Sequence, residues 1–423
     1  MFAQSQIDRI LKVLSRSDGS RGEIVDALYR VILGRDADVE GRETYAAALD
    51  NGATVEELAR ILLSSKEFED SGGFEALAVR FGLSRNSASD HPLAPWSWLY
   101  TPENAPYFSH KGLFRPVMII IETVNICNNA CVICPYSIHT RKKETMSLEL
   151  FQSIVTNYAE IGGGHVSLTP MLGEVLLDKF LRQRLDILHS NKLIQGVSAS
   201  TNVVMAKRYS DNDLNYILSK FRRIYVSVYG FDDEEYELMT KEAEYREMRE
   251  QLIRILKLAP EGTVVLGLRN LRRRSQEEQT EWADELGREA STAAPPILST
   301  GDEYLHWGDL QQAVPLPLDG KWRERTKNTQ QCLIPLSALQ ILADGTVSFC
   351  SCADYNANEA LRIGNVRETR LEDLLRGEKY KRLWNWRECG VPEFCRECGF
   401  HKPMTEGLNS SWTLNEPLNI VGG

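Results

Sequence analysis

Cysteine is the residue that decides what chemistry this chain of 423 residues can perform. Because the chain holds nine cysteines, an odd number, internal disulfides cannot pair them all. The first residues contain no basic stretch followed by an apolar run, so we expect no secretory signal and a cytoplasmic location. Cytoplasmic thiols stay reduced and are available as metal ligands. The cysteines form two groups: Cys127, Cys131 and Cys134, and then Cys332, Cys350, Cys352, Cys389, Cys395 and Cys398.

The first group has the spacing CxxxCxxC and directly follows an apolar run that predicts a buried strand. Three thiolates on one tight loop can hold three irons of a [4Fe–4S] cluster and leave the fourth iron open for a ligand. A zinc site with His139 as the fourth ligand is the alternative.

The elements that position this loop are predicted from Val117 onward, where short apolar runs alternate with helical patterns. That order predicts a parallel sheet with right-handed crossovers, and six units predict an open or partial (β/α)6 barrel. Chemistry in such sheets lies at the carboxyl ends of the strands. The predicted strands are 117–123, 165–169, 194–200, 223–229, 263–269 and 297–300, and the predicted helices include 148–161, 213–220 and 245–258.

The fold class is therefore α/β, with additions at both ends of the barrel. Residues 1–83 form an all-α domain, in which Thr54 and Glu57 predict a capping box. Proline-rich residues 84–116 form a linker, residues 117–310 the barrel, and residues 311–423 a C-terminal α+β domain. In that domain Asp344-Gly345 predicts a hairpin turn between strands 339–342 and 346–349.

The cysteine loop, with Glu122–Asn128 before it and Cys134-Pro135 at its end, resembles that of the radical S-adenosylmethionine (SAM) superfamily. The resemblance implies that Cys127, Cys131 and Cys134 hold a [4Fe–4S] cluster. It also implies cleavage of SAM to methionine and a 5′-deoxyadenosyl radical, which abstracts a hydrogen atom from substrate. Ile133 stands where the family more often has an aromatic residue, which weakens one contact to the adenine.

The same resemblance implies a set of SAM-binding residues at later strand ends. Leu172-Gly173-Glu174-Val175 lies at the position of the family's GGEP motif, with Leu172 and Val175 departing from it. The alternative for each residue is a polar group satisfied within the fold. The implied cofactor-binding residues are Gly173, Glu174, Ser200, Asn202, Ser227 and Arg269.

The C-terminal cysteines resemble the SPASM domain and its shorter twitch relative, which bind auxiliary clusters in radical SAM enzymes. The twitch form implies one auxiliary [4Fe–4S] cluster held by Cys332, Cys350, Cys395 and Cys398, and a zinc ribbon is the alternative. Cys352 and Cys389 are then spare. Cys352 shares a face with Cys350 if the strand continues, and it is an alternative ligand, a buried thiol or a hydrogen donor. Cys389 is expected to be structural.

The stretch Ala27–Asp36 resembles a small helical domain of unknown function that is related to phycobilisome linkers. Members of that family often accompany enzymes that handle glycans. A helical appendage for docking or oligomerisation is the alternative.

Composition limits the partners. A net charge of −10 argues against binding nucleic acid, and no apolar run is long enough to span a membrane. The run Arg272-Arg273-Arg274 is interpreted as a solvated loop or helix start, and the segment 304–309 either lines a substrate pocket or is a packed linker.

We therefore expect a radical SAM enzyme that acts on a carbohydrate or aminocyclitol, with Cys352 as the hydrogen donor of an epimerase. A dehydrogenase on a similar substrate, a peptide-modifying maturase and a non-catalytic iron–sulfur scaffold are the alternatives. The expected partners are a small-molecule or glycan substrate, an external electron donor such as flavodoxin or ferredoxin, and a second copy through the N-terminal helices.

Overall fold

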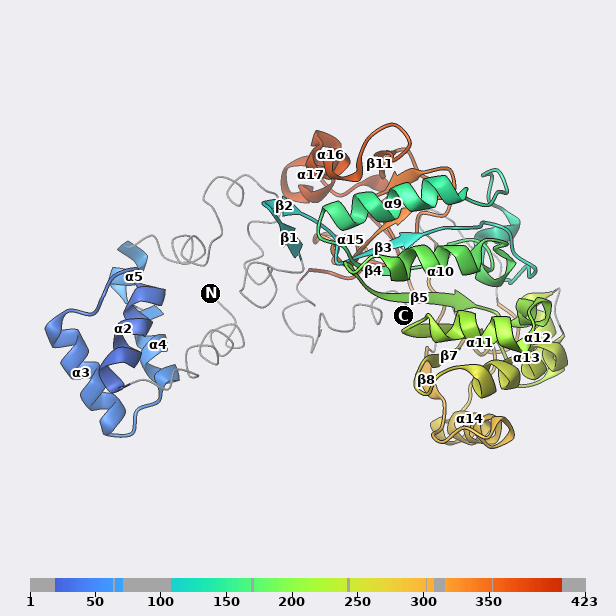
Figure 1. Ribbon diagram of the computed structural model, residues 1–423, viewed down its shortest axis with the longest axis horizontal. Coiled ribbons are helices and arrows are strands. Elements are labelled where there is room, and N and C mark those ends of the chain that lie inside the picture. Colours follow the sequence, from blue (N-terminus) through green and yellow to red (C-terminus); the bar gives the residue numbers. More distant parts are fainter. Residues whose placement is uncertain are drawn as a thin grey trace. The chain divides into compact units, whose positions relative to one another are not determined.

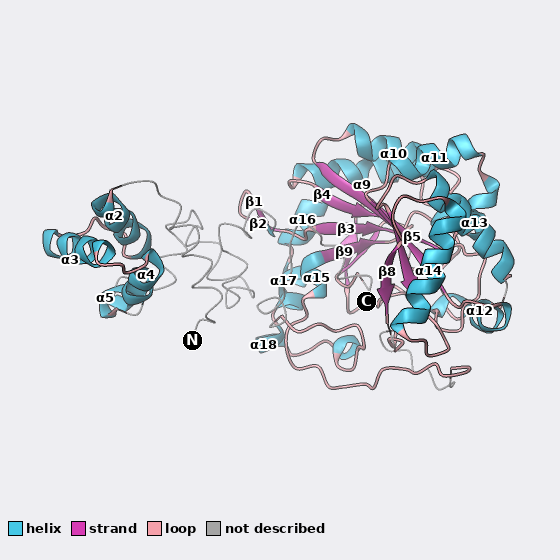
Figure 2. Cartoon of the chain, turned by 90° about the horizontal axis from the view of Figure 1, so that it is seen from below, coloured by secondary structure: helices cyan, strands magenta, loops and turns pink. Residues whose placement is uncertain are grey.

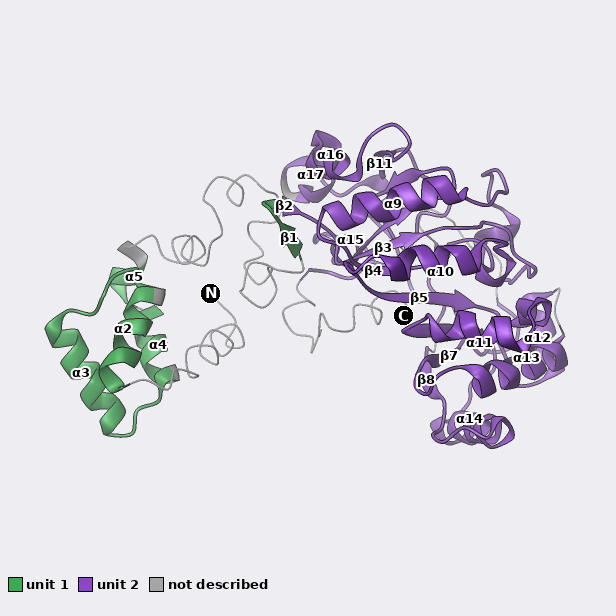
Figure 3. Ribbon diagram, in the orientation of Figure 1, with its two compact units in different colours: residues 1–112, 407–410 green, residues 113–406, 411–423 purple. Residues whose placement is uncertain are grey.

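The computed structural model describes residues 20–63, 65–70, 108–168, 171–241, 244–301, 303–307, 316–351 and 353–404. The chain divides into two compact units, with the boundary between Gly112 and Leu113 (Figure 3). No helix within these residues is long and apolar enough to cross a membrane.

The N-terminal unit is helical, as predicted. Its core consists of apolar side chains at helical spacing, among them Leu28, Ile32, Leu58 and Leu62. The predicted capping box is confirmed, because the Thr54 amide donates to the Glu57 carboxylate at 2.8 Å and the Glu57 amide donates to Thr54 Oγ1 at 3.2 Å. The helices are α2 (Arg21–Ile32), α3 (Val39–Asp50), α4 (Val55–Leu63) and α5 (Lys66–Asp70).

The second unit is built on one nine-stranded sheet with the order β11-β10-β9-β3-β4-β5-β6-β7-β8 (Figure 2). The six predicted barrel strands are confirmed and pair in parallel in chain order. They are β3 (Met118–Ile121), β4 (Gly164–Ser167), β5 (Ile194–Thr201), β6 (Arg223–Val228), β7 (Val264–Leu268) and β8 (Ile297–Thr300). A short hairpin of β1 (Ser109–His110) and β2 (Leu113–Phe114) precedes them.

Helices follow the barrel strands and cover one face of the sheet (Figures 1 and 2). The side chains of β6 show why the helices pack on this face. Ile224, Val226 and Val228 are apolar and buried, whereas Tyr225 and Ser227, which point to the other face, are half-buried. The barrel helices are α9 (Leu148–Glu160), α10 (Leu181–Ser190), α11 (Asp211–Ser219), α12 (Asp233–Thr240), α13 (Tyr245–Leu258) and α14 (Gln276–Ala290).

The C-terminal strands continue the barrel sheet. Strand β9 (Ala338–Ile341) pairs in parallel with β3, and β10 (Thr346–Ser348) pairs antiparallel with β9 and with β11 (Arg362–Asn365). The predicted hairpin is confirmed, and Gly345 at its turn has φ +90°. The remaining helices are α15 (Ile334–Ser337), α16 (Leu371–Arg376), α17 (Glu378–Trp384) and α18 (Trp386–Cys389).

The assumption of a strand that continues through Cys350 is wrong, because β10 ends at Ser348. The Ser348 hydroxyl donates to Asp354 at 2.6 Å and accepts from the Cys350 amide at 3.3 Å. After a last backbone bond from the Phe349 amide to the Leu361 carbonyl at 2.8 Å, these side-chain bonds hold the chain around Cys350. Cys352 itself lies outside the described residues.

Candidate functional site

The CxxxCxxC loop leaves the carboxyl end of β3, and its three thiols lie close enough to interact electrostatically. Burial raises the pKa of Cys127 to about 12 and that of Cys134 to about 11, and it also raises the pKa of Cys131. The thiols are therefore protonated at neutral pH, and a metal would displace their protons on binding.

Helix α12 holds the middle of this loop. The amides of Ala130 and Val132 donate to the carbonyls of Thr240 and Met239, at 3.1 and 2.8 Å. These carbonyls end the helix and would otherwise lack partners. The loop is thus fixed by backbone bonds on both sides of Cys131.

Asn125 closes the loop at its base. Its side chain donates to the Lys142 carbonyl at 2.8 Å and accepts from the Glu144 amide at 2.6 Å. The chain therefore returns to its starting point after the third cysteine, so the three thiols project from one closed turn.

Gly173 packs directly against the start of the thiol loop. Its φ is +127°, and a Cβ atom there would lie 2.5 Å from the Val124 carbonyl oxygen. The next amide, of Glu174, donates to the Ile126 carbonyl at 2.9 Å. The structure therefore brings the degraded GGEP motif to the thiol loop, and only glycine fits at position 173.

The Glu174 carboxylate is buried and accepts three hydrogen bonds from this chain. The donors are the Leu176 amide at 3.0 Å, the Thr201 hydroxyl at 2.6 Å and the Asn202 amide at 2.8 Å. Burial raises the pKa of this carboxyl despite these bonds. Glu174 thus connects the end of β5 to the loop after β4. The sequence predicted that this residue binds SAM and did not predict these internal hydrogen bonds.

Asn202 connects the end of β5 to the first cysteine. Its amide nitrogen lies 3.9 Å from Cys127 Sγ and 3.1 Å from Asn128 Oδ1. The Asn129 amide lies 3.5 Å from the same sulfur. N–H groups around a sulfur stabilise thiolates and tune iron–sulfur potentials.

Ser227 and Tyr229 lie at the end of β6, and Tyr229 was not predicted from the sequence. Tyr229 hydrogen-bonds the side chains of both Ser227 and Cys131, and burial raises the pKa of its phenol. Sequence reasoning named Ser227 and missed Tyr229, although strand alternation places residues 227 and 229 on one face. Ser200 lies on that face too, because it pairs with Tyr225.

Arg269 follows β7, and its amide donates to the Val228 carbonyl at 2.8 Å. Its carbonyl accepts from the Tyr304 hydroxyl at 2.7 Å. The predicted cofactor-binding residues from four strand ends thus lie along one edge of the sheet.

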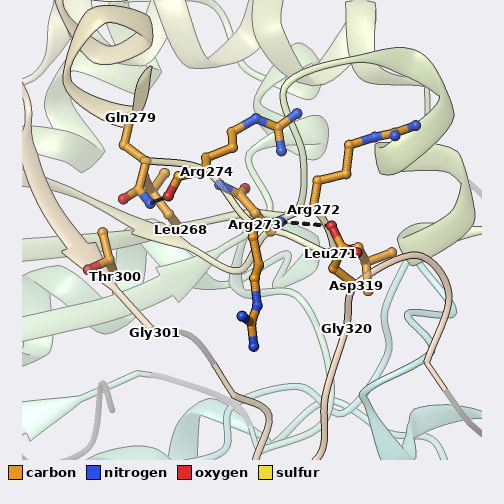
Figure 4. A pocket seen from close by; sticks show the side chains of 11 residues that line it. Leu268, Leu271, Arg272, Arg273, Arg274, Gln279, Thr300, Gly301, Asp319 and Gly320 are labelled. Atoms are coloured by element: carbon orange, nitrogen blue, oxygen red, sulfur yellow. Dashed lines mark hydrogen bonds between the residues drawn. The ribbon is translucent and has the colours of Figure 1, made fainter. Parts of the chain in front are cut away.

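A cavity of about 280 Å³ lies beyond the ends of β7 and β8, near the arginine run (Figure 4). Arg272 pairs with Glu234, and Arg274 pairs with the buried Glu235 at 2.7 Å. Arg273 is exposed, and its side chain lies between the segments at Gly301 and Gly320 (Figure 4). The run is a loop before α14, as interpreted, but two of its charges are paired.

The second thiol group contains Cys332, Cys350 and Cys395, which pack in a small apolar cluster with Ile334 and Trp386. The Cys398 thiol lies close enough to Cys332 and Cys350 to interact with them electrostatically. Burial and the neighbouring thiols raise the pKa of Cys395 and Cys398. The structure therefore brings together the four cysteines that sequence reasoning selected. Cys389 is exposed at the end of α18.

Asn328 holds the CxxC turn of this group and was missed from the sequence. Its side chain donates to the carbonyls of Cys395 at 2.8 Å and Cys398 at 3.1 Å. An isolated asparagine in an irregular segment carries no pattern that could have revealed this role.

Both thiol groups fit iron–sulfur clusters. Thiolates are the ligands of such clusters, and the triad also has N–H groups near its first sulfur. In the part of the chain that the structure describes, no three His, Cys, Asp or Glu side chains converge closely enough to hold a single metal ion. His139, the proposed zinc ligand, lies against the ring of Tyr136 at 5.4 Å.

Three family models match the chain. A radical SAM superfamily model matches residues 121–303, an iron-sulfur cluster-binding domain of the SPASM family matches residues 332–399, and a domain of unknown function, DUF4214, matches residues 13–71. No curated protein matched the sequence.

The chain is also similar to solved structures that are distant in sequence. The protein in the crystal structure of BtrN in complex with AdoMet and 2-DOIA is 16% identical to this chain, with a TM-score of 0.45. The match covers 67% of this chain and 93% of the BtrN chain. Native anSMEcpe with bound AdoMet and Cp18Cys peptide is 14% identical, with a TM-score of 0.47 and coverages of 73% and 99%. Streptococcus suis SuiB bound to precursor peptide SuiA is 12% identical, with a TM-score of 0.48 and coverages of 92% and 90%.

The loop geometry and the family models agree on the cofactors, which are SAM, the [4Fe–4S] cluster that binds it and auxiliary iron–sulfur ligation in the C-terminal domain. The chain therefore carries a radical SAM domain, residues 121–303, followed by an iron–sulfur cluster-binding SPASM domain, residues 332–399.

Proposed function

We propose that this enzyme abstracts a hydrogen atom from a hydroxyl-bearing carbon of a carbohydrate or aminocyclitol. The observation that carries the proposal is the polar character of the sheet face that the helices leave uncovered. When bound, the cluster and SAM supply the radical that removes the hydrogen atom. The protein's own residues bind and orient the substrate.

The strand register defines the members of this face. Ile120 pairs with Ser167, which pairs with Ser198 on the next strand. Residues one position away, such as Ile119, Val166 and Val197, are all apolar and buried under the helices. The same face carries an apolar cluster of Met118, Ile120 and Ala338. Its polar side chains are His165, Ser167, Ser198, Ser200, Arg223, Tyr225, Ser227 and Ser299 from the barrel strands, with Gln340 from β9.

Three of these side chains have buried polar atoms that nothing in the described structure satisfies. They are Nδ1 of His165, the Ser198 hydroxyl and both polar atoms of the Gln340 amide. Leaving such groups unpaired costs about 1–3 kcal/mol each. A hydroxyl-rich ligand offers both donors and acceptors, so it matches this face better than an apolar substrate does.

The proposed outcome of the radical is epimerisation. A thiol hydrogen from Cys352 would replace the abstracted hydrogen on the opposite face of the carbon. The thiyl radical left on Cys352 would then take one electron from the external donor and one proton from solvent. Cys352 is proposed because neither thiol group uses it and because, unlike Cys389, the other spare cysteine, it lies two residues from the auxiliary ligand Cys350 in the sequence.

The first experiment measures substrate-dependent formation of 5′-deoxyadenosine in deuterium oxide. Anaerobic enzyme with SAM and a reductant is offered sugars, amino sugars, aminocyclitols and peptides in parallel. Epimerisation predicts a product with one new carbon-bound deuterium, and Cys352→Ala still makes 5′-deoxyadenosine but no epimer. A product two hydrogens lighter than its substrate indicates a dehydrogenase, and turnover with peptides alone indicates a maturase.

A second experiment separates binding from folding at the polar face. Gln340→Met removes an unsatisfied amide from the core, so stability is expected to stay equal or to rise, while substrate-dependent turnover falls. Ser219→Ala on the exposed end of α11 is the control and leaves both unchanged. Full substrate turnover in Gln340→Met argues against recognition by this face.

A further inference from the structure

Trp307 touches the surroundings of both thiol groups. Its indole N–H donates to the Ile133 carbonyl at 2.7 Å, and Ile133 lies between Cys131 and Cys134. On the other side its ring packs against Phe400, with 5.1 Å between ring centroids and an interplanar angle of 52°.

Phe400 belongs to the second thiol group. Its side chain packs against the apolar cluster that contains Cys332, Cys350 and Cys395. Its backbone amide hydrogen-bonds the Cys398 thiol. Phe400 thus connects Trp307 to the auxiliary thiols by both a side-chain and a backbone contact.

The rest of the segment 304–307 fixes the position of the indole. The Tyr304 hydroxyl is bonded to the Arg269 carbonyl, and the ring of His306 stacks on Trp322 at 5.2 Å. Gly399 allows a close approach, because a Cβ atom there would lie 3.1 Å from the His306 backbone nitrogen. The segment is therefore held between the end of the barrel and the CxxC turn.

We propose that Trp307 is a positioning residue that couples the environments of the SAM-binding cluster and the auxiliary cluster. The inference rests on the cluster sites assigned above and adds a residue that belongs to neither ligand set. Hydrogen bonds and packing around the ligands set the reduction potential of an iron–sulfur cluster. Trp307 contributes one such hydrogen bond at the triad and one such packing contact at the auxiliary group.

The two contacts can be removed separately. Trp307→Phe keeps an aromatic ring beside Phe400 but loses the N–H donor to Ile133. The freed carbonyl dipole then makes adding an electron to the nearby cluster harder, so the potential of the SAM-binding cluster becomes more negative while the auxiliary potential is unchanged. Phe400→Leu shifts the auxiliary potential alone, and Trp307→Ala shifts both.

The measurement is an anaerobic redox titration of the full-length protein, followed by electron paramagnetic resonance of each reduced cluster. Trp282→Phe is the matched control, because its indole N–H also donates a hydrogen bond, to the Tyr245 hydroxyl at 3.1 Å, and because Trp282 belongs to neither thiol loop. That variant leaves both potentials unchanged. Iron and sulfide content, measured on every variant, reports whether the clusters are assembled.

Unchanged potentials and spectra in both Trp307 variants, at full iron content, would overturn the coupling and leave Trp307 as packing alone. If Trp307→Ala loses iron, Trp307→Phe and Phe400→Leu still decide the question, because each keeps most of the packing. A wild-type protein without two cluster signals would instead contradict the cluster assignments on which the inference rests.

Discussion

The guanidinium of Arg141 and the carboxylate of Glu122 form a buried bidentate ion pair, with both N–O distances at 2.6 Å. Glu122 directly follows β3, and Arg141 lies beyond the third cysteine, so the pair spans the thiol loop. Arg141 also donates to the Tyr355 carbonyl at 2.8 Å, and the Glu122 amide donates to the Ile341 carbonyl at 2.9 Å. One ion pair therefore fastens the thiol loop to the C-terminal strands.

Replacing Arg141 by Met is expected to destabilise the protein by about 3–5 kcal/mol, because a fully buried carboxylate loses its partner. The measurement is chemical unfolding of the purified protein. Arg182→Met is the control, since its pair with Asp213 is about half exposed and such pairs contribute about 0–1 kcal/mol. Equal losses in the two variants would contradict the clamp.

Changing Cys127, Cys131 and Cys134 together to Ala is expected to remove about four irons and all SAM cleavage, since the triad supplies the cluster ligands. Iron analysis and the yield of 5′-deoxyadenosine measure the two effects. Cys389→Ala, at an exposed position, is the control and keeps both. Continued 5′-deoxyadenosine formation in the triple variant is incompatible with the assignment.

Reconstituted wild-type protein is expected to bind about eight irons, four in each of two clusters. Changing Cys395 and Cys398 to Ala is expected to halve this number while the triad's cluster remains visible by electron paramagnetic resonance. A reproducible content near twelve irons would mean that Cys352 and Cys389 help to hold a third cluster.

Gly173→Ala is expected to impair cluster assembly without unfolding the sheet. The new Cβ atom would collide with the Val124 carbonyl, so the thiol loop has to move. Reduced iron retention at the triad, with full retention at the auxiliary group, is the expected result. Gly262→Ala also has a positive φ, of +72°, but meets nothing within 4 Å, and it serves as the strain control.

The buried imidazole of His165 is expected to lower the free energy of unfolding as the pH falls. Burial, and then Arg222, lower the pKa of this imidazole from 6.5 to about 4. As the pH falls from 6.5 through 4, the unfolded chain binds a proton that the folded state refuses, so stability is lost over this window by up to about 3 kcal/mol. Unfolding curves of His165→Gln against wild type should show a smaller loss, whereas His189→Gln on the exposed face of α10 should follow wild type.

The local part of this structure was predictable from the sequence. Apolar runs predicted strands such as β6 and β7 within a residue, because a buried strand needs a continuous apolar face. The loop cysteines were predictable because their spacing is short. Long-range pairing was not predictable: nothing near Ala338 indicates that β9 lies beside Met118 of β3.

The site residues divide in the same way. Asn202 follows a predicted strand and Ser227 lies near the end of another, so their place at the sheet edge could be inferred. Asn328 and Trp307 lie in irregular segments, and their roles depend on backbone carbonyls that only the fold brings to them. Glu174 was predicted to bind SAM, and its three internal hydrogen bonds could not be predicted from a motif.

The parallel pairing of β9 with β3 has a consequence for how the protein is made. Strand β3 is wholly apolar and buried, and without β9 it would be an unprotected edge that invites pairing with other chains. Strand β9 is separated from β3 along the sequence by more than half of the residues of the second unit. During synthesis β3 therefore remains an unpaired edge until β9 has been made. A chain cut short before residue 338 would therefore aggregate rather than fold into a smaller enzyme. The cysteines of the auxiliary group lie in the same C-terminal part of the chain as β9, the strand that protects the edge of β3 from pairing with other chains.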